Sequence, residues 1–148
     1  MIYLGADHRG FKLKEKIKGW LKERGTECTD LGNQRFDPVD DFPDCASAVA
    51  KKVSQGEGQG ILLCGSGGMA LVANKFKGVR AVETWNVATA EHAKAHDAAN
   101  VLMIAADFVE DVEAKKMVDT WLDTPVKQEE KYQRRLAKIG KIEETNYV

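Results

Sequence analysis

Short apolar runs alternate with amphipathic helical segments along almost the whole chain, and this alternation most constrains the fold. The runs Ile2–Leu4, Gly60–Leu63 and Val101–Ala105 are too short for buried helices and are typical of buried strands. Between such runs, apolar residues recur at every third or fourth position, as they do in amphipathic helices. Strands that alternate with helices form a parallel sheet covered on both faces. The sequence therefore predicts a three-layer, Rossmann-like α/β fold with a five-stranded parallel sheet.

The expected elements fill one domain, residues 1–148, without an internal repeat, a linker or a low-complexity tract. The five expected strands are Ile2–Leu4, Glu27–Leu31, Gly60–Leu63, Val79–Val82 and Val101–Ala105. The expected helices are centred on Leu13–Leu21, Ala46–Val53, Met69–Phe76, Ala88–His96 and Ala114–Leu122, and a C-terminal helical extension covers 126–145. Gly25 follows the first helix, where glycine commonly ends a helix.

Composition narrows the function classes. The 148 residues carry 22 Lys and Arg against 23 Asp and Glu, so the net charge of −1 gives no reason to expect a nucleic acid or an anionic membrane as partner. No apolar run approaches the roughly 18–20 residues that span a bilayer, and Asp7 follows the first apolar residues too early for a signal peptide. Three cysteines without a CxxC pair argue against a disulfide framework, so we expect a cytoplasmic protein.

The glycine-rich segment Cys64–Gly68 is the strongest local candidate for a site. It follows a predicted strand and enters a predicted helix, and ligands of open parallel sheets bind beyond the carboxyl ends of the strands. Glycines allow backbone amides to turn toward an anion, and a helix N-terminus favours negative charge there. A thiol in this place is expected to have a lowered pKa and to act as a base, with the Ser66 hydroxyl beside it. The alternative is a tight turn with an inert cysteine.

Histidines supply the other titratable candidates. His8 follows the first strand with Asp7, where it suits a phosphate or a sugar hydroxyl, or else caps the next helix. His92 and His96 have the i, i+4 spacing of a zinc pair, but no glutamate accompanies them as in a metalloprotease, so we expect no metal site. His96, close to the loop before the fifth strand, is the better general acid or base.

Motifs along the whole chain resemble those of type B ribose-5-phosphate isomerases, a family that includes galactose-6-phosphate isomerase subunits. Gly5–Lys14 resembles the family's DHxGFxLK opening, and Asp41–Ala46 resembles its DYPDYA helix entry. Gly60–Gly67 resembles the catalytic GILxCGTG, Ala73–Ala81 resembles ANK…GIRA, and Gln133–Arg135 matches the end of HQRR. The motifs occur in order and with nearly correct spacing, so the chain is identified as a member of this family.

The resemblance implies an aldose–ketose isomerase that acts on a small phosphorylated sugar, such as ribose 5-phosphate, through a cis-enediolate and without metal or cofactor. It implies that Cys64 is the base, that Ser66 helps to stabilise the enediolate, and that His96 opens the sugar ring. The residues implied in substrate binding are Asp7, His8, Gly65, Gly67, Gly68, Met69, Asp97, Lys131 and Arg135. Family members are homodimers or larger, so we expect a homodimer or homotetramer with shared active sites and the helix 126–145 at the subunit interface.

Several residues depart from the family pattern and leave the substrate open. The loop Cys64–Met69 is one residue shorter than CGTGxGM, and Asp97 replaces an asparagine that contacts the sugar. Asp107 replaces a phosphate-binding arginine, and Lys131-Tyr132 replaces Arg-His. A carboxylate near a phosphate is repulsive, so the sequence predicts weaker or altered phosphate binding. The alternatives are an isomerase of a different or non-phosphorylated sugar and a non-catalytic sugar-binding or regulatory homologue.

Overall fold

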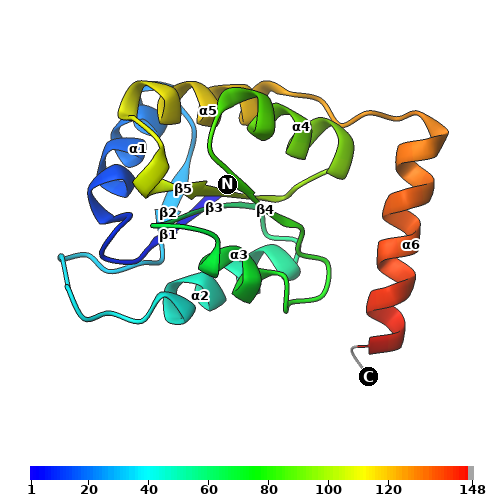
Figure 1. The fold of residues 1–148 in the computed structure, drawn as a ribbon, viewed down its shortest axis with the longest axis horizontal. Helices are drawn as coiled ribbons and strands as arrows, with labels where there is room; N and C mark the ends of the chain where they lie inside the picture. The colour runs from blue at the N-terminus through cyan, green and yellow to red at the C-terminus, as the bar shows by residue number, and fades with distance from the viewer. Residues whose placement is uncertain (147–148) are drawn as a thin grey trace.

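Five parallel strands form one sheet at the centre of the computed structural model, which describes residues 1–146 (Figure 1). The strand order is β2-β1-β3-β5-β4, and every neighbouring pair is parallel. The strands are β1 (Ile2–Ala6), β2 (Cys28–Asp30), β3 (Gln59–Cys64), β4 (Ala81–Thr84) and β5 (Val101–Ala105). The predicted five-stranded parallel α/β fold is therefore confirmed, and β5 has the predicted bounds.

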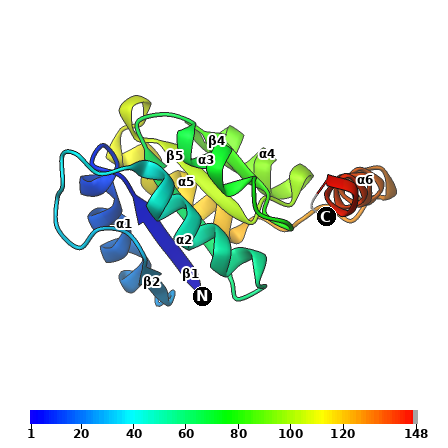
Figure 2. The ribbon, with the colours of Figure 1, turned by 90° about the horizontal axis from the view of Figure 1, so that it is seen from below.

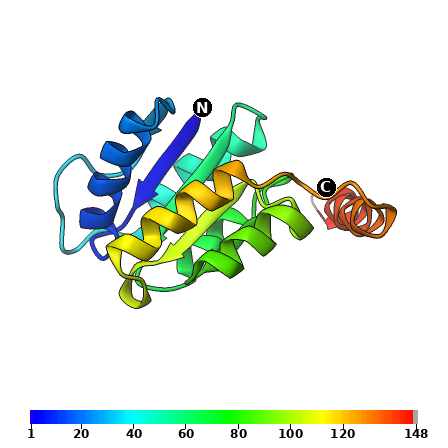
Figure 3. The same cartoon turned by 90° about the horizontal axis from the view of Figure 1, so that it is seen from above.

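Helices cover both faces of the sheet, as the alternation of elements predicts. The helices α1 (Phe11–Glu23), α4 (Val87–Asp97) and α5 (Asp111–Asp123) lie side by side on one face (Figure 3). The helices α2 (Phe42–Ser54) and α3 (Gly68–Ala73) lie on the other (Figure 2). No helix within residues 1–146 has the length and apolar content needed to cross a membrane.

Each central strand contributes to two hydrophobic cores because its side chains alternate between the two faces. In β3, Ile61 and Leu63 pack with α1 and α5, whereas Leu62 and Cys64 pack with α2 and α3. Trp121 is fully buried in the first core, and Trp20 packs only at its margin. Burial on both faces explains why these strands are almost continuously apolar.

A close backbone approach places the start of α1 beside the end of β3. A Cβ atom at Gly10 would overlap the carbonyl group of Leu63, so only glycine fits there. The amide of Asp7 also donates to the carbonyl oxygen of Leu63, at 3.2 Å. The segment after β1 and the last two residues of β3 are therefore held together at the carboxyl end of the sheet.

The C-terminal helix α6 (Glu130–Asn146) stands away from the sheet and its helices (Figures 1 and 2). None of its described residues is buried. The helix begins four residues after the predicted start at 126, because the chain before it is extended and the Lys127 amide bonds to the carbonyl of Ala95 at 2.8 Å. Near its far end, Glu143 accepts a hydrogen bond from the amide of Gly78 at 2.9 Å.

One short element was absent from the predicted set. The 3₁₀ turn η1 (Ala106–Phe108) directly follows β5 and holds Asp107 at the carboxyl edge of the sheet. The helix α3 is shorter than predicted, because the chain turns after Ala73 and the side chain of Asn74 bonds to both backbone groups of Ala81 at 2.8 Å.

Candidate active site

Three neighbouring strands, β1, β3 and β5, end at a hollow of about 390 Å³. Since all strands are parallel, their carboxyl ends meet at the same edge, where ligands of such sheets bind. The lining residues come from the segments after these strands and from the start of α2, and they are Asp7, His8, Arg9, Phe42, Cys64, Gly65, Ser66, Asp107 and Phe108. The structure thus brings together five of the predicted site residues: Asp7, His8, Cys64, Gly65 and Ser66.

Cys64 and Asp7 form a buried pair in this hollow. The Cys64 thiol donates to Asp7 Oδ2 at 2.9 Å, although the residues are 57 positions apart. Asp7 is only 4% exposed, and its Oδ1 accepts from the amides of Arg9 at 3.0 Å and Gly10 at 3.1 Å. These amides satisfy and orient the carboxylate, so that its other oxygen faces the sulfur.

The pKa of Cys64 differs from the sequence-based expectation. Burial, together with the hydrogen bond to Asp7, raises the pKa of the Cys64 thiol to about 11. Hydrogen bonds from the backbone amides of Ser66 and Gly65 lower it, which is the effect the glycine-rich turn predicts, but burial and Asp7 outweigh them. The predicted lowering of this pKa is therefore wrong for the chain by itself.

His8 is held by a residue that lies more than 30 positions further along the chain. Its Nδ1 lies 2.8 Å from Asp40 Oδ1, and its backbone amide donates to the same oxygen at 3.1 Å. Asp40 is in the loop between β2 and α2. His8 therefore has a fixed ring at the wall of the hollow and does not cap the following helix through its side chain.

Asp107 is paired with Arg9 at the mouth of the hollow. Arg9 Nε donates to Asp107 Oδ1 at 3.2 Å, and a second guanidinium nitrogen contacts Oδ2. The Asp107 amide also donates to the Gly65 carbonyl at 3.4 Å. The positive charge of Arg9 thus offsets the negative charge of Asp107, which the sequence analysis expects to repel phosphate. The sequence offers no signal for this pairing, because its two members are 98 residues apart.

In the loop after Cys64, the remaining glycines and Met69 have surroundings that differ from those of Gly65 and Ser66. Gly67 is the N-cap of α3, and Gly68 lies against the ring of Phe42. A Cβ atom at Gly67 would overlap the Glu83 carboxylate of β4, so a glutamate also lies beside this loop. Met69 is fully buried and does not line the hollow.

A second cluster forms around Tyr132 of α6. His96, at the end of α4, stacks on the Tyr132 ring with centroids 5.0 Å apart and planes at 2°. The cations of Lys131 and Arg135 lie 4.9 and 5.9 Å from the same ring. Three residues with a predicted substrate role thus share one surface.

Within one chain, the two clusters lie at opposite ends of the strands. The Cys64 cluster lies at their carboxyl ends and the Tyr132 cluster toward their amino ends. Cys64 is level with Ala105 at the end of β5, whereas His96 and Asp97 precede the start of β5 at Val101. Four residue steps of roughly 3.3 Å put about 13 Å of sheet between the two edges. Consequently, His96, Asp97, Lys131 and Arg135 do not line the hollow of their own chain.

Comparisons with known proteins identify the family. The model of the family described as Ribose/Galactose Isomerase matches residues 2–139. The chain belongs to this family. A protein named probable ribose-5-phosphate isomerase B from Mycoplasma genitalium is 41% identical over 145 residues, covering 96% of this chain and 95% of that protein. Ribose-5-phosphate isomerase B from Mycobacterium tuberculosis is 37% identical over 147 residues, covering 98% of this chain and 91% of the relative.

Solved structures of family members have the same fold. Ribose-5-phosphate isomerase B from Mycoplasma genitalium, solved with bound ribulose-5-phosphate, matches with a TM-score of 0.92 and 41% identity. The match covers 97% of this chain and 95% of that one. The enzyme from Clostridium thermocellum matches with a TM-score of 0.91 and 38% identity, covering 97% of both chains. The departures at Asp97, Asp107 and Tyr132 therefore stand within an otherwise shared architecture.

Proposed function

We propose that this protein is a ribose-5-phosphate isomerase that interconverts ribose 5-phosphate and ribulose 5-phosphate. The observation that carries the proposal is the buried Cys64–Asp7 pair at the hollow where three parallel strands end. Relatives that match nearly the whole chain are named for this activity, and one of them is solved with bound ribulose-5-phosphate. At the mouth of the hollow, Arg9 balances the carboxylate that would otherwise repel a phosphorylated sugar.

The proposed proton transfer begins with the hydrogen bond between Cys64 and Asp7. Asp7 accepts the thiol proton, and the thiolate then removes the proton from C2 of the open-chain aldose. The C2–H electron pair becomes the C1=C2 bond of the enediolate, and the carbonyl electrons move to O1. Return of the proton from sulfur to C1, with transfer of the hydroxyl proton from O2 to O1, yields the ketose, and Asp7 then gives its proton back to the sulfur. Cys64 thus acts as the base and Asp7 as its proton acceptor.

The turn after Cys64 is proposed to stabilise the enediolate. The amides of Gly65 and Ser66 already face the Cys64 sulfur, and the Ser66 hydroxyl lines the hollow. Charge appears on sugar oxygens only as the enediolate forms, so fixed donors stabilise the transition state more than the substrate. The backbone amides of Gly67 and Gly68 are proposed to belong to the same set of donors.

Residues of a second copy are proposed to complete each site. His96, Asp97, Lys131 and Arg135 lie at the wrong edge of the sheet to reach their own Cys64, yet α6 is unburied and carries the exposed side chains of Ile139 and Ile142. We propose that residues 1–148 form one domain, that α6 packs at a subunit interface, and that a homodimer or homotetramer brings His96 to the partner's hollow for ring opening. The three unpaired cysteines favour a cytoplasmic location.

Proton NMR in deuterated buffer tests the activity. Addition of ribose 5-phosphate is expected to give ribulose 5-phosphate with deuterium exchange at the carbon that loses its proton, and Cys64→Ala is expected to abolish both. Binding of the sugar phosphate without exchange would instead identify a non-catalytic homologue. The same assay with ribose and other aldoses decides whether the phosphate is required.

Mixing two inactive variants tests the shared site. Cys64→Ala and His96→Asn each remove one residue, and a heterodimer of the two has one intact site if His96 serves the partner's Cys64. Random exchange of equal amounts is expected to restore about a quarter of wild-type activity, because half of the dimers are mixed and each has one of its two sites intact. No recovery after subunit exchange would reject the shared site without rejecting the isomerase.

A further inference from the structure

Asp40 is a nearly buried carboxylate directly behind the wall of the hollow. Its side chain is 8% exposed, and its Oδ1 receives both the amide of His8, at 3.1 Å, and the His8 ring nitrogen Nδ1, at 2.8 Å. Two contacts from one residue to one oxygen fix the backbone and the ring of His8 together. The loop that carries Asp40 therefore determines how His8 faces the hollow.

The contact with Asp40 also determines which nitrogen of His8 carries hydrogen. An ionised carboxylate only accepts hydrogen bonds, so Nδ1 must be protonated in this geometry. The other nitrogen, Nε2, has no hydrogen-bond partner within the part of the chain that the structure describes. The His8 side chain is 35% exposed and lines the hollow, so Nε2 is the ring atom left for a ligand.

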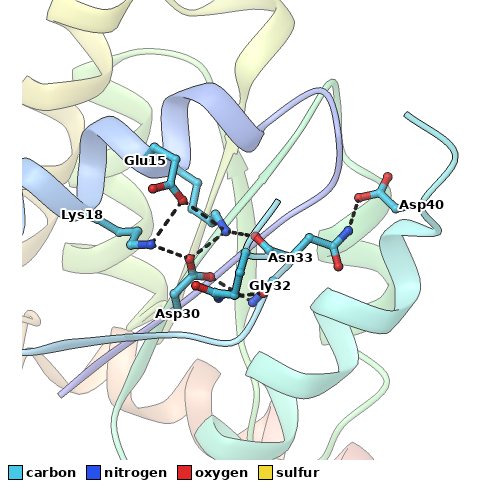
Figure 4. Close-up of polar contacts among 8 residues, drawn as sticks. Glu15, Lys18, Asp30, Gly32, Asn33 and Asp40 are labelled. Atoms are coloured by element: carbon cyan, nitrogen blue, oxygen red, sulfur yellow. Dashed lines mark hydrogen bonds and ion pairs between the residues drawn. The ribbon is translucent and has the colours of Figure 1, made fainter. Parts of the chain in front are cut away.

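A chain of polar contacts behind Asp40 holds it in place. Asn33 Nδ2 donates to Asp40 Oδ2 at 2.9 Å, and the Asn33 carbonyl accepts from Lys14 Nζ at 2.6 Å (Figure 4). Lys14 is fully buried on α1 and forms an ion pair with Asp30 at 2.7 Å. A buried ammonium group requires such partners, and the proposed chemistry does not otherwise use it. Lys14 thus fastens the loop to α1, and Asn33 relays that constraint to Asp40.

We propose that Asp40 is a positioning residue that keeps His8 in the Nδ1–H form, so that Nε2 contacts an oxygen of the sugar phosphate. The inference rests on the proposed function, because it takes the hollow as the substrate site. Imidazole in water favours hydrogen on Nε2, so Asp40 imposes the less common form. The pattern is the one in which a carboxylate behind a histidine fixes its orientation for a ligand on the other side.

Nitrogen NMR of the histidine rings tests the first half of the proposal. The chain has three histidines, and a His8→Gln variant identifies the signals of His8. In alkaline solution, where the rings are neutral, wild-type His8 is expected to show a protonated Nδ1 and an unprotonated Nε2. Asp40→Ala is expected to move the hydrogen to Nε2. A wild-type ring with hydrogen on Nε2, or an unchanged ring in Asp40→Ala, would overturn the proposal.

Steady-state kinetics test the second half. Asp40→Ala is expected to raise KM for ribose 5-phosphate about tenfold, the size of one hydrogen bond to a charged group, and to change kcat less than threefold. Asp40→Asn, whose amide oxygen can still accept from Nδ1, is expected to recover part of the loss. Asp37→Ala is the matched control, because Asp37 is an exposed carboxylate of the same loop and, within residues 1–146, bonds only to the nearby Val39 amide. KM values that are equal in Asp40→Ala and Asp37→Ala would contradict the positioning role.

The two proposals can fail separately. If the wild-type protein does not isomerise ribose 5-phosphate, the proposed function fails. Titration of His8 signals with ribulose 5-phosphate then still decides the role of Asp40, because the wild-type Nε2 signal must move on binding. If the Nε2 signal of His8 does not shift when ribulose 5-phosphate is added, the inference about His8 is rejected.

Discussion

The surroundings of Cys64 and those of His96 differ in how completely a single chain builds them. Cys64 and Asp7 are buried, and backbone amides, a neighbouring strand and the start of α1 determine their geometry. His96 instead stacks on Tyr132 of a helix that has no buried residue and stands apart from the sheet. The fold of a single chain completes the surroundings of Cys64. The surroundings of His96 instead expose cations and a histidine to any surface that packs against them. We therefore expect the proposed proton transfer to be internal to the domain, and ring opening and substrate recognition to depend on assembly.

Removal of the sulfur is expected to have the largest effect. Cys64→Ala should lower kcat by at least about a thousandfold, because it removes the group proposed to take the proton from C2. The NMR exchange assay measures the loss, and circular dichroism checks that the fold is retained. Cys28→Ala, which removes a thiol from β2 away from the hollow, is the control and should keep wild-type activity. A Cys64→Ala variant with near wild-type kcat would reject the assignment of the base.

Substitution of His96 is expected to lower turnover strongly only for sugars that form a ring. His96→Asn is expected to lower turnover of ribose 5-phosphate by about a hundredfold, the usual size of a general acid–base contribution. Turnover of an erythrose phosphate, which cannot form the ring, should change little. Glu91→Gln, at an exposed position of the same helix, is the control, because the His92 ring contacts that of His96. Equal losses of His96→Asn on both sugars would contradict a separate role in ring opening.

The pH dependence of alkylation sharpens the contrast at Cys64. Because burial and Asp7 raise the thiol pKa to about 11, the thiolate fraction and the alkylation rate should rise about tenfold for each pH unit between pH 7 and pH 10. Asp7→Asn removes the negative neighbour, so the pKa should fall and alkylation at pH 8 should become faster, while isomerase activity drops. Alkylation that already levels off near pH 8 in the wild type would show that the thiolate is stabilised in the way the sequence alone predicts.

The smallest effects are expected on the stability of the single chain when α6 is changed. Ile142 is 59% exposed, so Ile142→Ser should alter the free energy of unfolding of a monomer by no more than about 0.5 kcal/mol. It should instead weaken subunit association, which analytical ultracentrifugation measures. Ile17→Ala, in the core between α1 and the sheet, should cost roughly 2–5 kcal/mol and serves as the contrasting variant. An Ile142→Ser chain that unfolds more easily but assembles normally would place α6 within the domain.

The sequence by itself determined the elements, the parallel sheet and the strand ends that carry Asp7, His8 and Cys64. These follow from local patterns, because strand and helix periodicities are read within about ten residues and glycine-rich turns are visible as short motifs. The motif resemblance likewise led to the family that the comparisons identify.

Only the tertiary structure decided which charges meet. The contacts of Cys64 with Asp7, of Arg9 with Asp107 and of His8 with Asp40 join residues 57, 98 and 32 positions apart, and no local pattern encodes them. They reverse one sequence-based expectation and change the surroundings assumed in another. The thiol pKa rises because burial and a carboxylate outweigh the turn amides, and the carboxylate of Asp107 is balanced by an arginine. The sign of an electrostatic effect depends on burial and on the nearest charge, and both are properties of the folded chain.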